Sequence, residues 1–418
     1  MDAWLALDAE MRTAWVALAG LLMGVIVNWS VSSLAYEPRL TSPWSRRHPR
    51  DGRSVWLDRL PVLGWILLQR KSPTLGRGFW IRPLFVELGL AAALAALYAW
   101  EVLDGGLLPT GVPRHVLGNP MIAYPLHFTF VAHALLLGFM AAASLIDFDE
   151  LNIPDSITVP GTLVGLVFTT VLPWAFLPAG FDAKGQLFFV YSIYPYTNPT
   201  PLVGSPNFNS LVLLCGCFWL WCGGLLHRPW RTRHGYRRAL QLMFARMLRD
   251  RMTPRIALLA VGGTACITAV WLYAPVPWIG LGTSLIGLAV GGAMVWATRV
   301  IGTWALGMEA MGFGDVTLLA MIGSFVGWQA AVLVFFAAPG IALVFGSLQW
   351  VITRNNAFCY GPFLCIATAA IVVAWSPIWE WAEPRFSAGW LIPGVLVVGF
   401  VMLWAVLAGL RWLRTRGE

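Results

Sequence analysis

Residues 125–155 read PLHFTFVAHALLLGFMAAASLIDFDELNIPD, an apolar run that ends in a group of carboxylates. The run 125–146 contains no Asp, Glu, Lys or Arg, and its length suffices for a helix to cross the hydrocarbon core of a bilayer. Asp147, Asp149 and Glu150 follow directly. Because ionisable side chains at membrane depth are costly, they are candidates for function wherever they occur. This stretch therefore predicts a helical membrane protein with its chemistry at one edge of the bilayer.

The rest of the chain has the same character. Of its 418 residues, 58% are hydrophobic and 11% are charged, whereas a soluble domain carries about 25% charged residues. We expect an all-α bundle of about eleven transmembrane helices that forms a single membrane-embedded domain over residues 1–418. The other ten apolar runs lie at 13–34, 83–100, 157–177, 209–226, 256–273, 277–298, 318–336, 339–352, 361–376 and 391–410. The run 339–352 is short for a span, so it either joins its neighbour or re-enters the membrane.

The positions of Lys and Arg predict the orientation of the bundle. If the N-terminus lies outside, the segments on the inner side hold 24 of the 28 basic residues. These segments are 35–82, 227–255, 299–317, 353–360 and 411–418. Cytoplasmic loops are enriched in Lys and Arg, so we expect a cytoplasmic C-terminus and no nucleic-acid partner. The Arg-rich segment 227–255 is either a plain loop that sets this topology or a surface helix on anionic lipid.

A second acidic motif lies further along the chain. Residues 309–315 read EAMGFGD, and the orientation above places them at the same membrane face as Asp147. Two carboxylates that meet can share one proton, polarise a water molecule and direct it at a peptide carbonyl, as aspartic proteases do. Gly312 and Gly314 permit a tight turn and the close approach of a substrate strand. Asp147 and Asp315 are therefore candidates for a catalytic pair.

Each of these acids also has a simpler interpretation. Asp315 after Gly-Phe-Gly is a good helix N-cap, and Asp149, Glu150 and Asp155 fit an interfacial loop with a cap. A proton-coupled transporter is a further alternative, but it would need acids spread through the bilayer rather than gathered at one edge. The expected meeting of Asp147 with Asp315 at one face is what favours peptide hydrolysis.

With these motifs the chain resembles the type IV prepilin peptidases, a family of GxGD aspartyl proteases. The landmarks occur in the family's order: Gly24 to Asn28, Trp56 to Trp65, Arg82 to Glu87, Ile146-Asp147, Ile153 to Gly161, Glu309 to Asp315, Gly323 to Gln329, and Tyr360 to Phe363. The last of them begins with Tyr360, where the family pattern has Phe. The resemblance implies that Asp147 and Asp315 are the catalytic pair. It also implies that the following residues shape the site or contact the substrate: Gly312, Gly314, Asp149, Pro154, Asp155, Glu309, Glu87 and Asn28.

The resemblance implies cleavage of the short basic leader from prepilins or pseudopilins, which serve type IV pilus and type II secretion assembly. The cleavage site would lie at the cytoplasmic face of the bacterial inner membrane. Membrane lipid and the apolar helix of the substrate would be the partners, and proteolysis itself would need no cofactor. Many family members also methylate the new N-terminus with S-adenosylmethionine, and this second activity stays open here.

Three departures from the family pattern bear on these expectations. Residues 35–82 contain no cysteine and only His48 as another zinc ligand, so the zinc site of many members is not expected, since tetrahedral zinc needs about four ligands. Thr317 replaces a basic residue two positions after the second Asp. Residues 179–275 form an expected insertion with two extra spans. An altered, inactive relative that serves pilus or secretion assembly is therefore the alternative to a peptidase.

Overall fold

The computed structural model describes most of the chain, and three of the predictions fall outside the described part. The described residues are 2–38, 43–44, 56–72, 76–109, 112, 114–184, 187–192, 206–226, 241, 245, 249–308, 311–353 and 359–417. Glu309, His48 and most of the Arg-rich segment 227–255 lie outside them.

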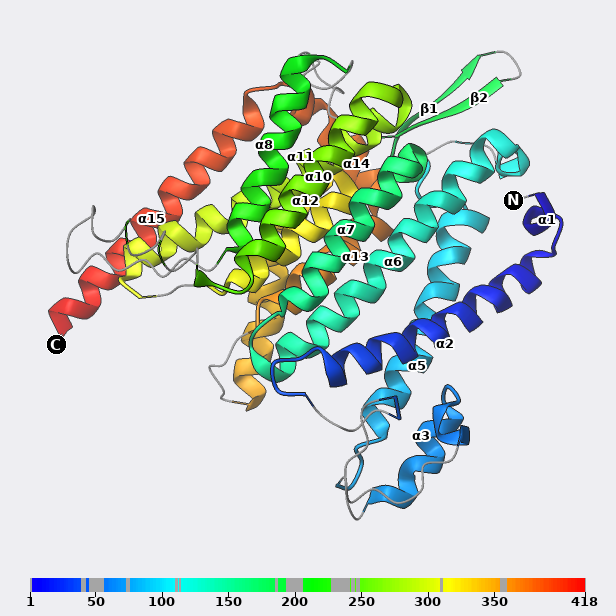
Figure 1. Ribbon diagram of the computed structural model, residues 1–418, viewed down its shortest axis with the longest axis horizontal. Helices are drawn as coiled ribbons and strands as arrows, with labels where there is room; N and C mark the ends of the chain where they lie inside the picture. The colour runs from blue at the N-terminus through cyan, green and yellow to red at the C-terminus, as the bar shows by residue number, and fades with distance from the viewer. Residues whose placement is uncertain are drawn as a thin grey trace.

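Long helices dominate the described structure (Figure 1). They are α2 (Ala9–Ser33), α5 (Ile81–Tyr98), α6 (Pro120–Glu150), α8 (Phe208–Leu225), α10 (Thr253–Tyr273), α11 (Pro275–Leu306), α12 (Phe313–Thr353) and α15 (Leu391–Gly417). Shorter helices are α1 (Asp2–Leu5), α3 (Leu63–Leu67), α7 (Asp155–Val171), α13 (Gly361–Val373) and α14 (Trp375–Ser387). Short 3₁₀ turns occupy Trp56–Arg59, Leu68–Lys71, Arg114–Gly118 and Pro173–Ala175, and a π-helical turn, Ala99–Leu103, continues α5.

By length and composition, 8 of the described helices could cross a membrane, or 9 if α13 and α14, which meet at 92°, form one broken span. The sequence predicted eleven. One difference is α7, which has 17 residues, at the lower limit of what a span needs. The other is α12, in which the runs 318–336 and 339–352 join. A helical architecture of the membrane type is confirmed, with fewer helices of spanning length than expected.

Helix α12 breaks at Gly327, which has φ 81° and ψ 171°, a region of backbone space that is essentially restricted to glycine. The break reverses the direction of the chain. Asp315 and Pro339 would lie about 36 Å apart along a straight helix, yet both line one cavity. The two arms of α12 therefore lie alongside each other, and the second arm returns toward the level at which the first begins.

Replacing Gly327 with Ala is expected to lower the free energy of unfolding by about 1–3 kcal/mol, because a Cβ is strained in this backbone conformation. The change can be followed as a lower midpoint of thermal unfolding in detergent. Gly340 lies in the second arm of the same helix and has open space around it. Gly340→Ala is therefore the matched control and should be neutral or slightly stabilising. Equal midpoints for the two variants would contradict this account of the break.

The centre of the bundle is a backbone-to-backbone contact between α11 and the first arm of α12. A Cβ built on Gly287 would lie 2.0 Å from the carbonyl oxygen of Gly323, so no side chain fits there. Close to this contact, the Ser284 hydroxyl donates a hydrogen bond to the carbonyl of Ser324 at 2.6 Å. Small residues let membrane helices approach in this way. The tight contact holds the first arm of α12, and with it Asp315, in a fixed position against α11.

One two-stranded antiparallel ribbon interrupts the helical architecture, in a segment for which the sequence predicted only a loop. Its strands are β1 (Pro178–Lys184) and β2 (Leu187–Ser192). Two indole N–H groups of α14 hold its start: Trp375 donates to the carbonyl of Pro178 at 2.7 Å, and Trp379 donates to that of Ala179 at 2.9 Å. The ribbon projects from the end of the bundle opposite to α3 (Figure 1).

A buried acid–imidazole pair joins α6 to the π-helical turn after α5, and sequence analysis missed it. His133 Nδ1 lies 2.6 Å from Glu101 Oε1, and the two residues are only 4% and 0% exposed. Neither residue lines the cavity that contains Asp315. A transporter would need acids along a path through the bilayer, whereas Glu101 is an acid held by a direct partner. We therefore assign the pair a role in holding the two helices together.

Because Glu101 and His133 are partners, we expect single and double substitutions of them to differ in their effect on the free energy of unfolding. His133→Leu leaves the Glu101 carboxyl buried without its partner, which is expected to cost about 1–3 kcal/mol of stability. The double variant Glu101→Leu/His133→Leu removes both polar groups and should recover most of that loss, because replacing both partners of a buried hydrogen bond with apolar side chains can be nearly neutral. Thermal unfolding of the purified proteins measures both. A double variant that is less stable than the single one would argue against the pair.

Candidate active site

Asp147 lies on the last turn of α6, at the point where the helix ends. The helix stops because Leu151 adopts a left-handed conformation (φ 54°, ψ 29°), and its N–H closes the last turn on the carbonyl of Asp147. Asp147 is only 5% exposed. Its carboxylate accepts a hydrogen bond from the backbone N–H of Gly361, at the start of α13, at 3.1 Å. The C-terminal end of α6 and the N-terminal end of α13 thus hold this carboxyl group between them.

Asp315 lies in the first turn of α12, directly after the glycine turn, and is 8% exposed. The turn is held from two sides. A Cβ on Gly314 would lie 2.8 Å from that of Ile153, so the turn presses against the segment that follows α6. The Thr317 hydroxyl donates to the carbonyl of Gly314 at 3.0 Å. Thr317, which stands in place of a basic residue, is thus buried, and its hydroxyl is hydrogen-bonded within its own helix.

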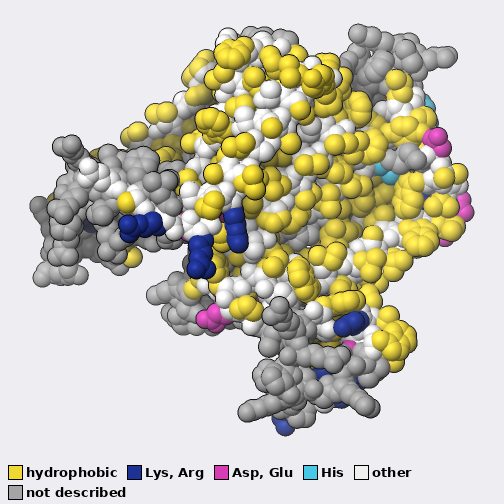
Figure 2. Space-filling model, viewed as in Figure 1, with side chains coloured by type: hydrophobic (Ala, Val, Ile, Leu, Met, Phe, Trp, Pro, Cys, Tyr) yellow, Lys and Arg dark blue, Asp and Glu magenta, His cyan; other side chains and the backbone are white. Residues whose placement is uncertain are grey.

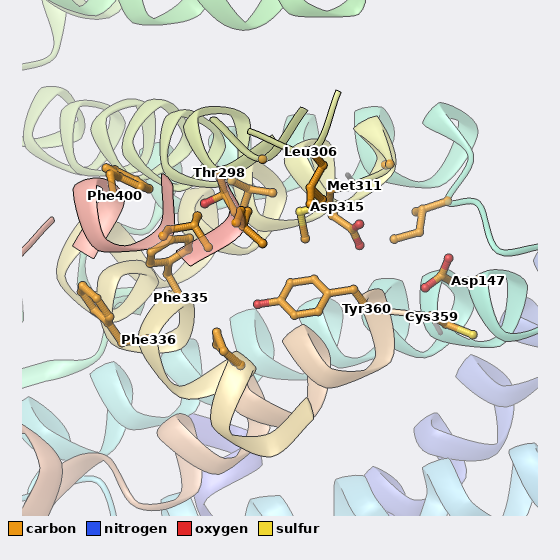
Figure 3. Close-up of a pocket in the computed structure, with 18 of the residues that line it drawn as sticks. Asp147, Thr298, Leu306, Met311, Asp315, Phe335, Phe336, Cys359, Tyr360 and Phe400 are labelled. Atoms are coloured by element: carbon orange, nitrogen blue, oxygen red, sulfur yellow. The ribbon is translucent and has the colours of Figure 1, made fainter. Parts of the chain in front are cut away.

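The two carboxyl groups line one cavity of about 850 Å³. Figure 3 shows Asp147 at one end of the group of labelled side chains and Asp315 nearer its middle, above the Tyr360 ring. In sequence they are 168 residues apart, so the pairing is a product of the tertiary structure. Two buried carboxyl groups in one cavity are the groups that can activate a water molecule and transfer protons to and from a peptide bond.

The remainder of the cavity is largely apolar. Phe335, Phe336 and Pro339 come from the second arm of α12, and Phe400, Leu403 and Leu407 come from α15. The side chains of α11 that face it include Thr298 and Leu306. Because the second arm of α12 folds back at Gly327, aromatic rings surround the space beside the carboxyl groups. The cavity is therefore suited to an apolar peptide segment that places one peptide bond near the acids.

Two side chains of this cavity were not among the predicted site residues. Cys359 and Tyr360 line it directly before Gly361. Burial, and then the charge of Asp315, raises the pKa of the Tyr360 hydroxyl above its usual value, so the phenol stays protonated. Residues 360–363 resemble the family pattern Phe-Gly-Pro-Phe. The replacement of its first Phe by Tyr360 was the signal in the sequence that this position carries a hydroxyl group.

A third residue that sequence analysis missed is Arg299 on α11. Its Nε–H donates to the carbonyl of Met311 at 2.9 Å. Its guanidinium carbon lies 5.8 Å from the centre of the Phe313 ring, within the range of a cation–π contact. Arg299 thus holds the chain on both sides of Gly312, which itself lines the cavity. A guanidinium from a neighbouring helix stabilises the turn that presents Asp315.

The other predicted site residues lie around the cavity or apart from it. Pro154 is the N-cap residue of α7, directly after Ile153, and Asp155 is exposed in the first turn of that helix. Asp149 forms an ion pair with Arg82, at 2.7 Å between Oδ1 and Nη1. Neither Asp149 nor Asp155 lines the cavity. The ion pair with Arg82 ties the end of α6 to the start of α5, and none of the three residues lines the cavity of the carboxyl pair.

Glu87 and Asn28 lie together, but away from the carboxyl pair. Glu87 is 1% exposed, and its carboxylate accepts three hydrogen bonds, from Asn28 Nδ2 at 3.2 Å, Val62 N at 2.6 Å and Trp65 Nε1 at 2.7 Å. These bonds tie α2 and α5 to the short helix α3. Neither residue lines the cavity. Their described contacts hold the loop after α2 in place.

No metal site can be assigned within the described ranges, because they contain no group of three or more His, Cys, Asp and Glu side chains that could hold an ion. The prediction for residues 35–82 continues to rest on the sequence, since part of that segment, including His48, is not described.

Comparison with known proteins identifies the part of the chain around Asp315. Residues 242–347 match the model of the Type IV leader peptidase family. Similar curated proteins are prepilin leader peptidase/N-methyltransferases: that of Aeromonas salmonicida (strain A449) is 32% identical over 94 residues, which is 22% of this chain and 32% of that protein. The protein of Aeromonas hydrophila is 29% identical over 112 residues (26% and 38%), and that of Pseudomonas putida is 31% identical over 102 residues (23% and 35%).

The aligned segments span only about a third of the length of these curated relatives. No solved structure matches the chain. The matched region contains the glycine turn, Asp315 and the first arm of α12, whereas Asp147 precedes it. Residues 242–347 are thus similar to the type IV leader peptidase family.

Proposed function

We propose that this protein is an aspartic endopeptidase that removes the short basic leader from prepilin-like or pseudopilin substrates. One observation carries the proposal. Asp147 and Asp315, from helices far apart in sequence, line a single cavity and are each less than 9% exposed. Buried carboxyl groups that share a cavity can divide acid and base roles between them, because ionisation of one disfavours ionisation of the other. The similarity of residues 242–347 to the type IV leader peptidase family supports this substrate class.

The chemistry requires one water molecule and two proton transfers. The ionised carboxylate accepts a proton from the water, whose oxygen attacks the carbonyl carbon of the scissile peptide bond. The protonated carboxyl group donates its proton to the carbonyl oxygen, which gives a tetrahedral intermediate with two hydroxyl groups. That intermediate collapses as its C–N bond breaks: the carboxyl group that took the proton from water donates it to the leaving nitrogen, and the other carboxylate accepts a proton from a hydroxyl group of the intermediate. Both carboxyl groups thereby return to their starting protonation states.

The surroundings of Asp147 and Asp315 fit a substrate that has a basic leader followed by an apolar helix. The apolar surface formed by α12 and α15 is suited to the hydrophobic helix that follows the leader. The Lys and Arg side chains visible in Figure 2 gather along one edge below a broad apolar surface. With the charge count of the sequence, this distribution supports a cytoplasmic position for that edge in a bacterial inner membrane.

The proposal is tested by co-expression with a prepilin-like substrate that carries an epitope tag at its C-terminus. Mass spectrometry of the product should show cleavage at the end of the basic leader, and it reports in the same experiment whether the new N-terminus gains a methyl group. The matched control substrate has the same apolar helix with an acidic leader and should remain largely uncut. No cleavage of either substrate by the folded protein would favour the alternative, an assembly component without peptidase activity.

A further inference from the structure

Tyr360 places a phenol inside the cavity, and its main chain is fixed relative to one of the two acids. The next residue, Gly361, donates its N–H to the Asp147 carboxylate at 3.1 Å. Figure 3 shows the Tyr360 ring extending across the cavity beside Asp315, with its hydroxyl directed away from Asp147 and toward Thr298 and Phe335. The hydroxyl therefore lies on the side where the apolar lining begins.

This hydroxyl is an uncommitted donor. Among the described residues, it has no hydrogen-bond partner. The other hydroxyl of the lining, that of Thr298, is used within its own helix, where it donates to the carbonyl of Met294 at 3.0 Å. Asn152 is exposed, and the Cys359 thiol is a weak donor. A strong donor without a partner in apolar surroundings gains much from a ligand that supplies an acceptor.

A peptide that is cut at the edge of the membrane supplies such an acceptor. The peptide bond that reacts must leave its helix, and the neighbouring carbonyl groups then lose their partners in the helix. In apolar surroundings, each unsatisfied main-chain group costs several kcal/mol, so a donor in the wall of the cavity stabilises the extended substrate. Because the phenol stays protonated, it can donate throughout the physiological pH range.

We propose that the Tyr360 hydroxyl donates a hydrogen bond to a main-chain carbonyl of the substrate on the apolar-helix side of the scissile bond. This inference rests on the proposed peptidase function and adds a residue that binds the extended substrate through a hydrogen bond. Phe in the family pattern at this position would lack the hydroxyl, so the contact is a property of this chain.

The test compares Tyr360→Phe, which removes only the hydroxyl, with Tyr273→Phe, which changes an exposed tyrosine at the C-terminal end of α10. The substrate is a synthetic peptide with a basic leader followed by an apolar segment. Tyr360→Phe should lower kcat/KM about tenfold, the effect of losing one buried hydrogen bond, while Tyr273→Phe should leave it unchanged. The thermal unfolding midpoint should stay the same in both. Wild-type kcat/KM in Tyr360→Phe would overturn the inference.

A binding measurement separates this inference from the proposed function. In the Asp315→Asn background, which should not turn over, adding Tyr360→Phe should weaken binding of the same peptide about tenfold. Equal binding with and without the hydroxyl, or no binding in either protein, would overturn the inference. If the wild type binds the peptide in this way but never cleaves it, the peptidase proposal fails while the contact stands.

The acceptor can be located with a series of peptides, each of which carries one ester in place of a peptide bond after the cleavage site. An ester carbonyl is a weaker acceptor, so one member of the series should bind less well to the protein that retains the hydroxyl. For that member, Tyr360→Phe should cause little further loss, since both changes remove the same hydrogen bond. Fully additive losses along the whole series would contradict a contact with the main chain.

Discussion

Leader removal is expected to fall by at least about 10³-fold when either Asp147 or Asp315 is replaced with Asn. Asparagine has nearly the same shape as aspartate, and its side-chain oxygen can still accept the hydrogen bond from the N–H of Gly361. It cannot, however, give up or take up a proton in this chemistry. Fold and membrane level should therefore stay near wild type while the reaction stops. A time course with the prepilin-like substrate, quenched and separated on a gel, measures the loss.

The double variant Asp147→Asn/Asp315→Asn sharpens this prediction. If the two carboxyl groups act as one unit, the double variant should be no slower than either single one, because residues that act together are strongly non-additive. Asp104→Asn changes an acid at the end of the π-helical turn after α5, outside the cavity, and serves as the control. It should cleave at the wild-type rate. Undiminished processing by either single variant would remove that residue from the mechanism.

Gly361→Ala is the second substitution expected to have a large effect, although it changes no ionisable group. A Cβ at this position would lie 2.7 Å from Asp147 Oδ2 and 2.8 Å from Ile153 Cδ1. The Asp147 carboxylate must then move, and its hydrogen bond to the backbone of Gly361 is distorted. A displacement of about 1 Å at a reacting group can cost about 10²-fold in rate, so cleavage should fall by roughly that factor.

Two comparisons distinguish this effect from a loss of folding. Alanine is a better helix former than glycine, so the start of α13 should tolerate the change, and the thermal unfolding midpoint should fall little. Gly216→Ala on α8 meets no neighbouring atom within 4 Å and is the matched control. In the Asp147→Asn background, Gly361→Ala should cause no further loss of cleavage. A Gly361→Ala protein with wild-type activity would show that the position of Asp147 is not critical.

Some parts of the site were predictable because they depend on local sequence. The carboxyl group of Asp147 follows an uninterrupted apolar run, and Asp315 follows a glycine turn at the start of another. Burial of apolar side chains in a helix and the ending of that helix at polar residues are decided within about 20 residues. The similarity of residues 242–347 to the leader peptidase family was likewise visible in short motifs.

Other parts could not be predicted, because the same pattern fits several arrangements. Glu87 and Asn28 were assigned to the site by resemblance, yet their contacts hold α3 against α2 and α5. The pattern of apolar residues also does not show that α12 reverses at Gly327, since a helix can contain a glycine without breaking there. Nor does it show that Glu101 meets His133, which depends on the contact between two helices.

By itself, the sequence determined that this is a helical membrane protein and that Asp147 and Asp315 stand at the ends of apolar helices. The hydrophobic effect and the cost of an unsatisfied backbone in lipid act on each segment separately, so a linear pattern suffices to predict them. Only the tertiary structure decided that Asp147 and Asp315 line one cavity, that aromatic side chains of α12 and α15 wall it, and that Tyr360 enters it. Those outcomes depend on how whole helices pack, through contacts such as that of Gly287 with Gly323. The angle and distance at which two helices pack depend on the side chains of both helices, so neither segment alone predicts them.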